Sequence, residues 1–389
     1  MPVRWAEKID LLSESMTVAV SDRARELQQR GVKVVNLGGG DPDFNTPPHI
    51  VEAAVKAMNQ GLTHYVASKG IPELRKAITG KLQRDNHVAY DPDTEVIVTA
   101  SGKLALYITL AAMLEPGDEV LYFDPAWVSY EPMIRMLDGV PVDVPLRPED
   151  NFLLDGDVLK SRITPRTKAM ILNSPNNPTG RVLTRDELNV VARSAQEHGF
   201  WVLSDEIYEP IIYDKHQHIS LAALPGMRDL TVTLNGMSKA YAMTGWRLGY
   251  LGAPAPLCEQ ILKVQQHVVT CAPSFVQAAG VAALQGPQGC VAEMVAEYDR
   301  RRRFMTDALN ALPGVHCPLP EGAFYLFPRV THRGMDSNAL AKFMIEEAHV
   351  AVTPGAAFGK TGAQNVRLTF ATSMANLQQA IEQLKAAMG

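Results

Sequence analysis

The sequence predicts an α/β protein in which a large, mainly parallel sheet is joined to a smaller α+β unit. The length of 389 residues exceeds the roughly 100–200 residues of a typical single domain, so two domains fit it. From about residue 94, short apolar runs alternate with helical patterns. These runs are apolar almost throughout, as in parallel strands that helices cover on both faces.

The expected elements follow one another in the order of a doubly covered sheet. Strands are expected at residues 95–100, 119–123, 168–173, 200–204, 230–234 and 246–251. A helix is expected over residues 105–114, and a second helix over residues 184–198. In the second helix we expect Thr184 as N-cap, Glu187 three residues on as its capping-box partner, and Gly199 as the end.

The pattern changes after about residue 290. A long helix is followed by an expected strand at 323–327, a helix at 339–348 and a strand at 366–370. This succession indicates a separate α+β unit, with which an N-terminal helix (20–30) and short strand (34–37) can pack. We therefore expect a large domain over residues 47–289, and a small domain made of residues 1–46 and 290–389.

Composition and charge exclude several classes of protein. Hydrophobic residues make up 46% and charged residues 20%, which is ordinary globular composition, and the net charge of −5 gives no reason to expect nucleic acid. No stretch resembles a signal peptide and no run of 18 apolar residues exists, so we expect a cytoplasmic protein without a membrane partner. The widely spaced cysteines are expected to be free thiols, at positions Cys258, Cys271, Cys290 and Cys317.

Two other polar clusters are interpreted as surface features. His216 and His218 lie between charged residues with no other ligand pair close in sequence, so we expect a surface loop and no metal site. The basic run at 300–303 lies in a helical pattern and is expected to be a solvated helix face.

Ligands of open α/β sheets bind beyond the carboxyl ends of the strands, so the residues that follow each strand are candidates. Ser101, Gly102 and Lys103 follow one strand and open a helix, where backbone N–H groups can receive a phosphate. An ordinary strand-to-helix turn is the alternative. Asn177, held before Pro178, offers a fixed amide to a ligand oxygen, and a plain turn explains it equally well.

Three charged residues stand where apolar surroundings make a charge costly. Asp205 ends the most apolar strand and is expected to face a cation, although an N-cap role is the alternative. Lys239 lies in a weakly charged stretch, where a desolvated amine has a lowered pKa and becomes nucleophilic, whereas most lysines are simply exposed. Arg247 lies eight residues on, where an anion would explain a cation in so apolar a run.

The glycines at 38–40 do not form a dinucleotide fingerprint, because position 43 is Asp43 and not glycine. A nicotinamide-dependent dehydrogenase is therefore disfavoured.

Taken together, eight segments resemble the class I aminotransferases of the fold-type-I group of pyridoxal-phosphate enzymes, and within them the bacterial aspartate aminotransferase branch. The segments are GDPDFNTP (40–47), YVASKGIPELR (65–75), SGKLAL (101–106), PAW (125–127), NNPTG (176–180), SDEIY (204–208), SKAYAMTGWR (238–247) and NVRLTF (365–370). The resemblance covers nearly the whole chain and implies a large domain with a seven-stranded sheet, the cofactor pyridoxal 5′-phosphate and a homodimer with shared active sites.

The resemblance also implies residue roles in catalysis and cofactor binding. Lys239 would hold the cofactor as a Schiff base and shuttle the substrate proton, while Asp205 would pair with the protonated ring nitrogen. Tyr208 and Asn177 would hydrogen-bond the phenolic oxygen of the ring. The remaining cofactor contacts implied are Trp127 on the ring face, Ser101, Gly102, Lys103 and Arg247 around the phosphate, and Tyr65 from the neighbouring subunit.

Substrate contacts are implied as well. Arg367 would grip the α-carboxylate through its planar donors, and Gly40 would let a backbone N–H approach the substrate, with Trp127 and Asn177 beside it. Many relatives carry a serine three residues before the lysine, whereas this chain has Gly236. That departure weakens one phosphate contact.

The choice of amino acid is the open part of the interpretation. Ser15, Thr17 and Lys103 match the positions that meet a distal carboxylate in the bacterial aspartate branch, which favours aspartate or glutamate. The alternative is that Lys103 only neutralises phosphate and that both hydroxyls cap the first helix. Aromatic, alanine, branched or arginine donors, a fold-type-I lyase reaction, and a non-catalytic cofactor sensor remain the rival functions.

Overall fold

The computed structural model describes residues 6–12 and 16–389, and its centre is a seven-stranded sheet. The strand order is β2-β8-β7-β6-β5-β3-β4, and β8 runs in the opposite direction to the other six strands of this sheet. The strands are β2 (Val96–Thr99), β3 (Glu119–Asp124), β4 (Val140–Pro145), β5 (Thr167–Asn173), β6 (Trp201–Asp205), β7 (Thr231–Gly236) and β8 (Gly249–Gly252). The predicted α/β class with a mainly parallel sheet is confirmed.

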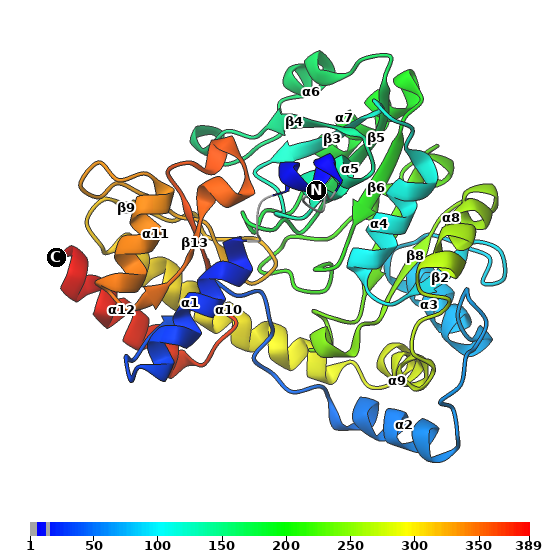
Figure 1. Cartoon of the computed structure of the whole chain (residues 1–389), viewed down its shortest axis with the longest axis horizontal. Coiled ribbons are helices and arrows are strands. Elements are labelled where there is room, and N and C mark those ends of the chain that lie inside the picture. The colour runs from blue at the N-terminus through cyan, green and yellow to red at the C-terminus, as the bar shows by residue number, and fades with distance from the viewer. Residues whose placement is uncertain (1–5, 13–15) are drawn as a thin grey trace, which may run out of the picture.

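Helices cover both faces of this sheet (Figure 1). One face packs against α4 (Gly102–Met113), α5 (Tyr130–Met136) and α8 (Ala255–Val268). The other face packs against α6 (Gly156–Arg162) and α7 (Arg185–His198), and near β2 and β8 against α3 (Pro72–Asp85) and α9 (Ser274–Gln285). The helix α2 (Pro48–Asn59) lies outside, against α9.

A smaller α+β unit lies beside the sheet, on the left in Figure 1. It contains the antiparallel sheet of β10 (Tyr325–Leu326), β14 (Val366–Thr369) and β13 (Thr353–Pro354) and the two-stranded antiparallel sheet of β9 (Val315–His316) and β11 (Arg329–Val330). Its helices include α11 (Ser337–Glu346) and α12 (Met374–Met388). The 22-residue α10 (Gly289–Asn310) runs between the two units.

The N-terminal segment packs with this smaller unit, as expected. The strand β1 (Val35–Asn36) pairs in parallel with β12 (Val350–Ala351), and α1 (Met16–Gln29) contributes Ala24 and Leu27 to a shared apolar cluster. The proposed domain limits at residues 47 and 289 stay a prediction.

Local signals mark both ends of α7. In α7 the Thr184 side chain accepts a bond from the Glu187 N–H, the Glu187 carboxylate accepts one in return, and Gly199 ends the helix in the left-handed region with φ 71°. The predicted capping box is therefore confirmed. None of the described helices is long and apolar enough to cross a membrane.

Two expected strands are shorter than predicted. The strand expected from residue 246 begins at Gly249, because Arg247 has φ 56° and so cannot continue an extended strand; Arg247 precedes β8 and does not lie inside it. Ala323 likewise has φ 56°, so that β10 begins only at Tyr325.

Two surface predictions are wrong in part. Arg302 is fully buried and binds Asp299 and Asp214 at 2.8 Å each, while Arg301 is buried against Asp43, so the basic run is not a solvated face. Stacking on aromatic rings and ion pairing keep these guanidinium groups inside.

His218 is the other exception. Its side chain is only 10% exposed and its Nε2 lies 3.0 Å from the Glu206 carboxylate, whereas His216 is exposed as expected. The buried Glu206 carboxylate, which also accepts from the Ser204 hydroxyl, is the hydrogen-bond partner that holds His218 inside.

Candidate active site

One cavity of about 470 Å³ lies at the carboxyl ends of β5, β6 and β7 and at the start of α4. Eleven residues selected from the sequence line it: Gly40, Ser101, Gly102, Lys103, Trp127, Asn177, Asp205, Tyr208, Lys239, Arg247 and Arg367. The parallel strands end at one edge of the sheet, so residues far apart in sequence meet there.

The Lys239 amine lies inside this cavity and donates a hydrogen bond of 2.6 Å to the Gly40 carbonyl. Burial lowers the pKa of Lys239 to about 8, the carboxylate of Asp41 opposes the shift, and the guanidinium groups of Arg367 and Arg247 add to it. An amine with this pKa is neutral in about one molecule in ten at pH 7, far more often than an ordinary lysine, and can act as a nucleophile or base.

The Asp205 carboxylate is held by two donors at the end of β6. The Tyr130 hydroxyl donates to Oδ2 at 2.7 Å, and the Ile207 N–H donates to Oδ1 at 3.2 Å. Burial raises the pKa of Asp205 to about 6, against the lowering effect of the Tyr130 bond. An enclosed acid of this kind is suited to a cationic partner, which would restore its ionised form.

Arg367 enters from β14 and is 2% exposed. Its Nη1 donates to Asn177 Oδ1 at 3.1 Å and its Nη2 donates to the Gly38 carbonyl at 2.6 Å. Its Nε is buried without a hydrogen-bond partner among the described residues. A buried donor left unpaired is costly, so an anion such as a carboxylate completes this group.

Two tyrosines face each other next to Arg367. The hydroxyls of Tyr208 and Tyr325 lie 2.8 Å apart, and the centroid of the Tyr325 ring lies 4.5 Å from the Arg367 guanidinium carbon.

The Asn177 side chain has a fixed orientation. Because Asn177 Oδ1 accepts from Arg367, Nδ2 of Asn177 is the group that can donate into the cavity.

The opposite end of the cavity is built for an anion. Ser101 caps α4, and its Oγ accepts from the Leu104 N–H at 3.1 Å. Ser101, Gly102 and Lys103 line the cavity, so the N-terminus of this helix offers free N–H groups to an anion there. Arg247, fixed by a bond of 2.7 Å from its Nη1 to the Thr244 carbonyl, adds a cation there. A Cβ at Gly249 would lie 2.3 Å from the Gly102 nitrogen, which explains the glycine.

The side chains proposed for substrate choice are only partly described. Lys103 Nζ lies 4.8 Å from the Trp127 ring centroid, and burial together with Arg247 lowers its pKa. Ser15 lies outside the described residues, and so does the side chain of Thr17, whose backbone belongs to α1. Tyr65 does not line the cavity and is 85% exposed.

Sequence reasoning missed other residues that line the cavity: Ser21, Gly39, Asp41, Tyr130, Asn173, Ile207, Asn235, Ser238, Thr244 and Tyr325. Asn173 ends β5 and Asn235 is the second-last residue of β7, so the strand-end argument could have found both. Tyr130 and Tyr325 carry no such signal, because they reach the site from a helix and from the smaller unit.

The residues present fit pyridoxal phosphate together with an amino-acid substrate. The cavity volume lies within the range of about 300–1,000 Å³ usual for small-molecule sites. An amine, an enclosed carboxylate, a helix N-terminus with an arginine, and a second arginine with an unpaired donor match the aldehyde, ring nitrogen, phosphate and substrate carboxylate.

Comparisons with known proteins show which proteins the chain resembles over nearly its whole length. The sequence profile of aminotransferase class I and II matches residues 32–384. The chain is 45% identical to an aspartate aminotransferase of Musicola paradisiaca over 98% of this chain and 96% of that one. It is 40% identical to aromatic-amino-acid aminotransferase 2 of Thermococcus litoralis over 98% and 97%. Aspartate aminotransferase from Thermus thermophilus with maleate superposes with a TM-score of 0.95 at 40% identity, covering 99% of this chain and all of that one.

Proposed function

The chain belongs to the class I and II aminotransferase family, and from this membership we propose that it acts on aspartate or glutamate. It is a pyridoxal-phosphate-dependent enzyme that moves an amino group from an amino acid to a 2-oxo acid. The observation that carries the proposal is one cavity that holds Lys239, Asp205 and Arg367 together.

We propose distinct roles for the side chains around the reacting atoms. Bound pyridoxal phosphate supplies an aldehyde that takes up amino groups and a ring that accepts the electrons released at the substrate Cα. Asp205, positioned by Tyr130, would hold the proton of the ring nitrogen. Lys239 would hold the cofactor through its Nζ, and the released amine would take the proton from the substrate Cα and deliver it to the C4′ carbon of the cofactor.

The remaining groups bind and orient. Arg367 binds the substrate α-carboxylate, and its bond to Asn177 connects that carboxylate to the donor beside the ring. Tyr208 would donate to the phenolic oxygen, and Trp127 would stack on the ring face. Ser101, Gly102 and Arg247 bind the phosphate at the N-terminus of α4, with Lys103 beside them. Gly40 leaves room for its backbone to approach the substrate.

Lys103 supports an acidic substrate, because it places a cation at the cavity next to Trp127. We propose that it meets the distal carboxylate of the substrate together with Ser15 and Thr17. Aromatic donors are the second candidate. The rings of Trp127, Tyr208 and Tyr325 all line the cavity, and a relative at 40% identity is named an aromatic-amino-acid aminotransferase.

We also propose a cytoplasmic homodimer in which Tyr65 reaches the phosphate site of the partner. The exposed face of α2 carries Val51, Val55 and Met58, which are 39%, 45% and 40% exposed. These residues are three or four positions apart and so form one apolar stripe, which a second copy of the chain would cover. All four cysteines are free, in keeping with a reducing compartment.

A half-reaction screen tests the substrate class. Each amino acid is mixed with the purified holoenzyme, and the rate of loss of the aldehyde-form absorbance is followed. We expect aspartate and glutamate to react fastest. We expect Lys103→Ser to slow them by about 10-fold or more, the usual scale for a lost charge-assisted contact, while neutral amino acids change little.

The matched control is Lys263→Ser, which removes a lysine of α8 that binds only Gln260 among the partners described. It should leave every rate unchanged. Equal losses for acidic and neutral substrates in Lys103→Ser would assign Lys103 to phosphate alone. Faster reaction with phenylalanine or tyrosine than with aspartate would favour the aromatic candidate.

A further inference from the structure

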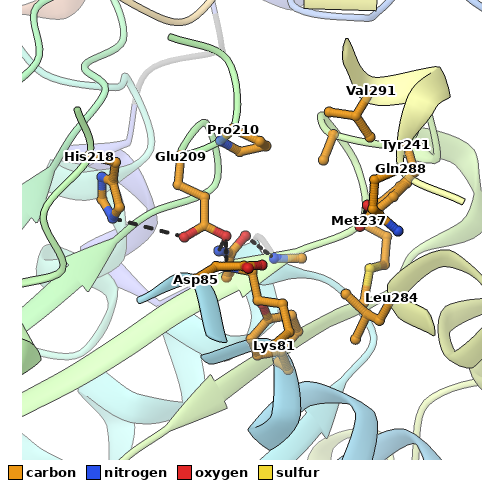
Figure 2. Close-up of a pocket in the computed structure, with 14 residues that line it drawn as sticks. Lys81, Asp85, Glu209, Pro210, His218, Met237, Tyr241, Leu284, Gln288 and Val291 are labelled. Atoms are coloured by element: carbon orange, nitrogen blue, oxygen red, sulfur yellow. Dashed lines mark hydrogen bonds and ion pairs between the residues drawn. The ribbon is translucent and has the colours of Figure 1, made fainter. Parts of the chain in front are cut away.

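A second, smaller cavity lies behind the strand-end segments of the candidate active site (Figure 2). The segment at 236–241 separates the two cavities: Ser238 and Lys239 line the first, whereas Met237, Ala240 and Tyr241 line the second. Asn235 lines both. The side of this segment that faces away from the first cavity therefore contacts a separate set of side chains.

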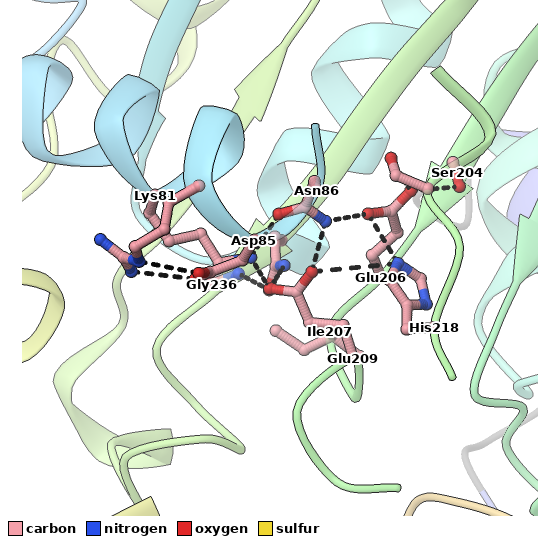
Figure 3. A network of polar contacts seen from close by, with 12 residues as sticks. Lys81, Asp85, Asn86, Ser204, Glu206, Ile207, Glu209, His218 and Gly236 are labelled. Atoms are coloured by element: carbon pink, nitrogen blue, oxygen red, sulfur yellow. Dashed lines mark hydrogen bonds and ion pairs between the residues drawn. The ribbon is translucent and has the colours of Figure 1, made fainter. Parts of the chain in front are cut away.

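The segment at 205–209 alternates in the same way. Asp205 and Tyr208 line the first cavity, whereas Glu209 lines the second and Glu206 is fully buried on that side. Figure 3 shows the polar contacts that gather there. We call Lys81, Asn86, Glu206, Glu209 and His218 the rear network.

Glu209 joins three parts of the chain within the rear network. Its Oε1 contacts the Lys81 ammonium group of α3 and accepts from Asn235 Nδ2 at 2.9 Å. Its Oε2 accepts from Asn86 Nδ2 at 2.6 Å. Asn235 Oδ1 in turn accepts from the Gly236 N–H at 2.7 Å, three residues before the reactive lysine. Glu209 thus connects the segment after β6 to the segment after β7.

Glu206 fixes the same segment from its other side. Its Oε1 accepts from the hydroxyls of Ser204 at 2.9 Å and Ser220 at 2.8 Å. Its Oε2 is 3.0 Å from both Asn86 Nδ2 and His218 Nε2. Burial acts to raise the pKa of Glu206, but His218 and these bonds reverse the effect and hold the pKa below its usual value, so the buried group stays ionised.

Stability alone does not call for such a network. Burying ionised groups costs free energy, and apolar residues of similar size often replace a buried ion pair without loss of stability. Burial also lowers the pKa of Lys81 to about 8, which is the sign of an ammonium group held in unfavourable surroundings. What apolar packing would not reproduce is the fixed direction of the Asn235 amide and of the turn at 205–209.

We propose that Glu209, held by Lys81 and Asn86, is a positioning residue that fixes the segments of Asp205 and Lys239 relative to each other. The inference rests on the proposed function, because it takes these two residues as the groups that hold the cofactor. Glu209 does not line the first cavity and acts on it through Asn235 and through the backbone of its own turn.

The first experiment titrates apoenzyme with pyridoxal phosphate and follows absorbance, with thermal unfolding measured in parallel. Glu209→Ala should weaken cofactor binding by about 10- to 100-fold, the scale on which small misplacement of reacting groups acts. It should lower kcat more than it changes the substrate KM. The control is Glu119→Ala, because the Glu119 side chain is 5% exposed against 9% for Glu209 and is also ion-paired, but lies at the far end of β3.

The double variant Lys81→Met/Glu209→Leu separates positioning from stability. It replaces the ion pair with apolar side chains of similar size, so its melting temperature should lie above that of Glu209→Ala, in which the buried Lys81 ammonium group is left without this carboxylate. Cofactor binding should nevertheless remain weakened.

Two outcomes would overturn the inference. Wild-type affinity in the double variant would show that the rear network serves only the stability of the fold. Unchanged affinity in Glu209→Ala would do the same. A wild-type protein that binds no pyridoxal phosphate would instead overturn the proposed function, so that the two failures are distinguishable.

Discussion

An ammonium group enclosed at a strand end loses the water that stabilises its charge. In Lys239 this lowers the pKa from 10.5 to about 8 in the folded protein. Below pH 8 the folded apoenzyme therefore bears the cost of an enclosed ammonium. The cost is relieved as pH rises from about 8 to 10.5, because the folded chain has then released a proton that the unfolded chain still binds.

Replacing this lysine removes that cost and the reactive amine together. We expect apo Lys239→Met to be more stable than the apo wild type at pH 7, by at most about 3.5 kcal/mol at roughly 1.4 kcal/mol per pKa unit. The difference should shrink between pH 8 and 10.5. Thermal unfolding of both apo proteins across this pH range is the measurement. The variant should also lack the visible absorbance of the bound cofactor and nearly all turnover.

Lys263→Met supplies the comparison, since its lysine lies on the surface of α8. A stability difference for Lys239→Met that does not depend on pH would show that the lowered pKa is not its cause. Full transaminase activity in the same variant would contradict the proposed mechanism.

The sequence identified site residues where local context was sufficient. Asp205 and Lys239 follow strands, and a charge in so apolar a stretch requires a partner whatever the rest of the fold is. Tyr325 reaches the cavity only because the smaller unit packs there. Lys81 and Glu209 are 128 residues apart, so no local pattern could predict their contact.

At the scale of elements, the same reasoning worked best for helices with explicit ends. Thr184, Glu187 and Gly199 mark α7, and the structure has all three in the expected roles. β4 was not predicted. Its sequence, Val-Pro-Val-Asp-Val-Pro, contains two prolines, which strands tolerate mainly at the edge of a sheet. β4 lies at one of the two edges of this sheet.

The close approach of β8 to the start of α4 gives a prediction at this scale. In Gly249→Ala the added Cβ would lie 2.3 Å from the Gly102 nitrogen and 2.4 Å from the Ser101 carbonyl carbon. The strand and the helix must separate, so we expect a loss of stability of about 1–3 kcal/mol or more from overpacking. Weaker cofactor binding should accompany it, because the same N-terminus would receive the phosphate. Thermal unfolding and cofactor titration measure the two effects.

Gly80→Ala is the matched substitution in a different element. Gly80 lies within α3, and a Cβ there meets no atom within 4 Å. This change should stabilise the protein by about 0.5–1 kcal/mol through helix propensity and leave cofactor binding unchanged. If both variants lost the cofactor equally, close packing at Gly249 would not be the reason.

At the scale of the whole molecule, two features of the surface point to a second copy of the chain. Tyr65 is 85% exposed and lies outside the first cavity, yet the resemblance assigns it to a phosphate site. The apolar stripe of α2 lies a few residues before it in the chain. A homodimer accounts for both observations, since the face that covers the stripe would also bring Tyr65 to the partner's site.

A charge placed in that stripe tests the dimer. In Val55→Lys an ammonium group would be buried against the partner, at a cost that an interface of two apolar stripes does not offset. Because the symmetric contact repeats the substitution on both sides, we expect a shift from dimer to monomer at micromolar concentration, measured by sedimentation velocity. The monomer should bind pyridoxal phosphate less tightly than the dimer, since each site would lack the tyrosine of its neighbour.

Tyr65→Phe separates the two effects: it should leave the dimer intact and weaken only the binding of the cofactor. A Val55→Lys protein that remains dimeric would place the interface elsewhere, and a monomer with undiminished cofactor affinity would show that each chain completes its own site.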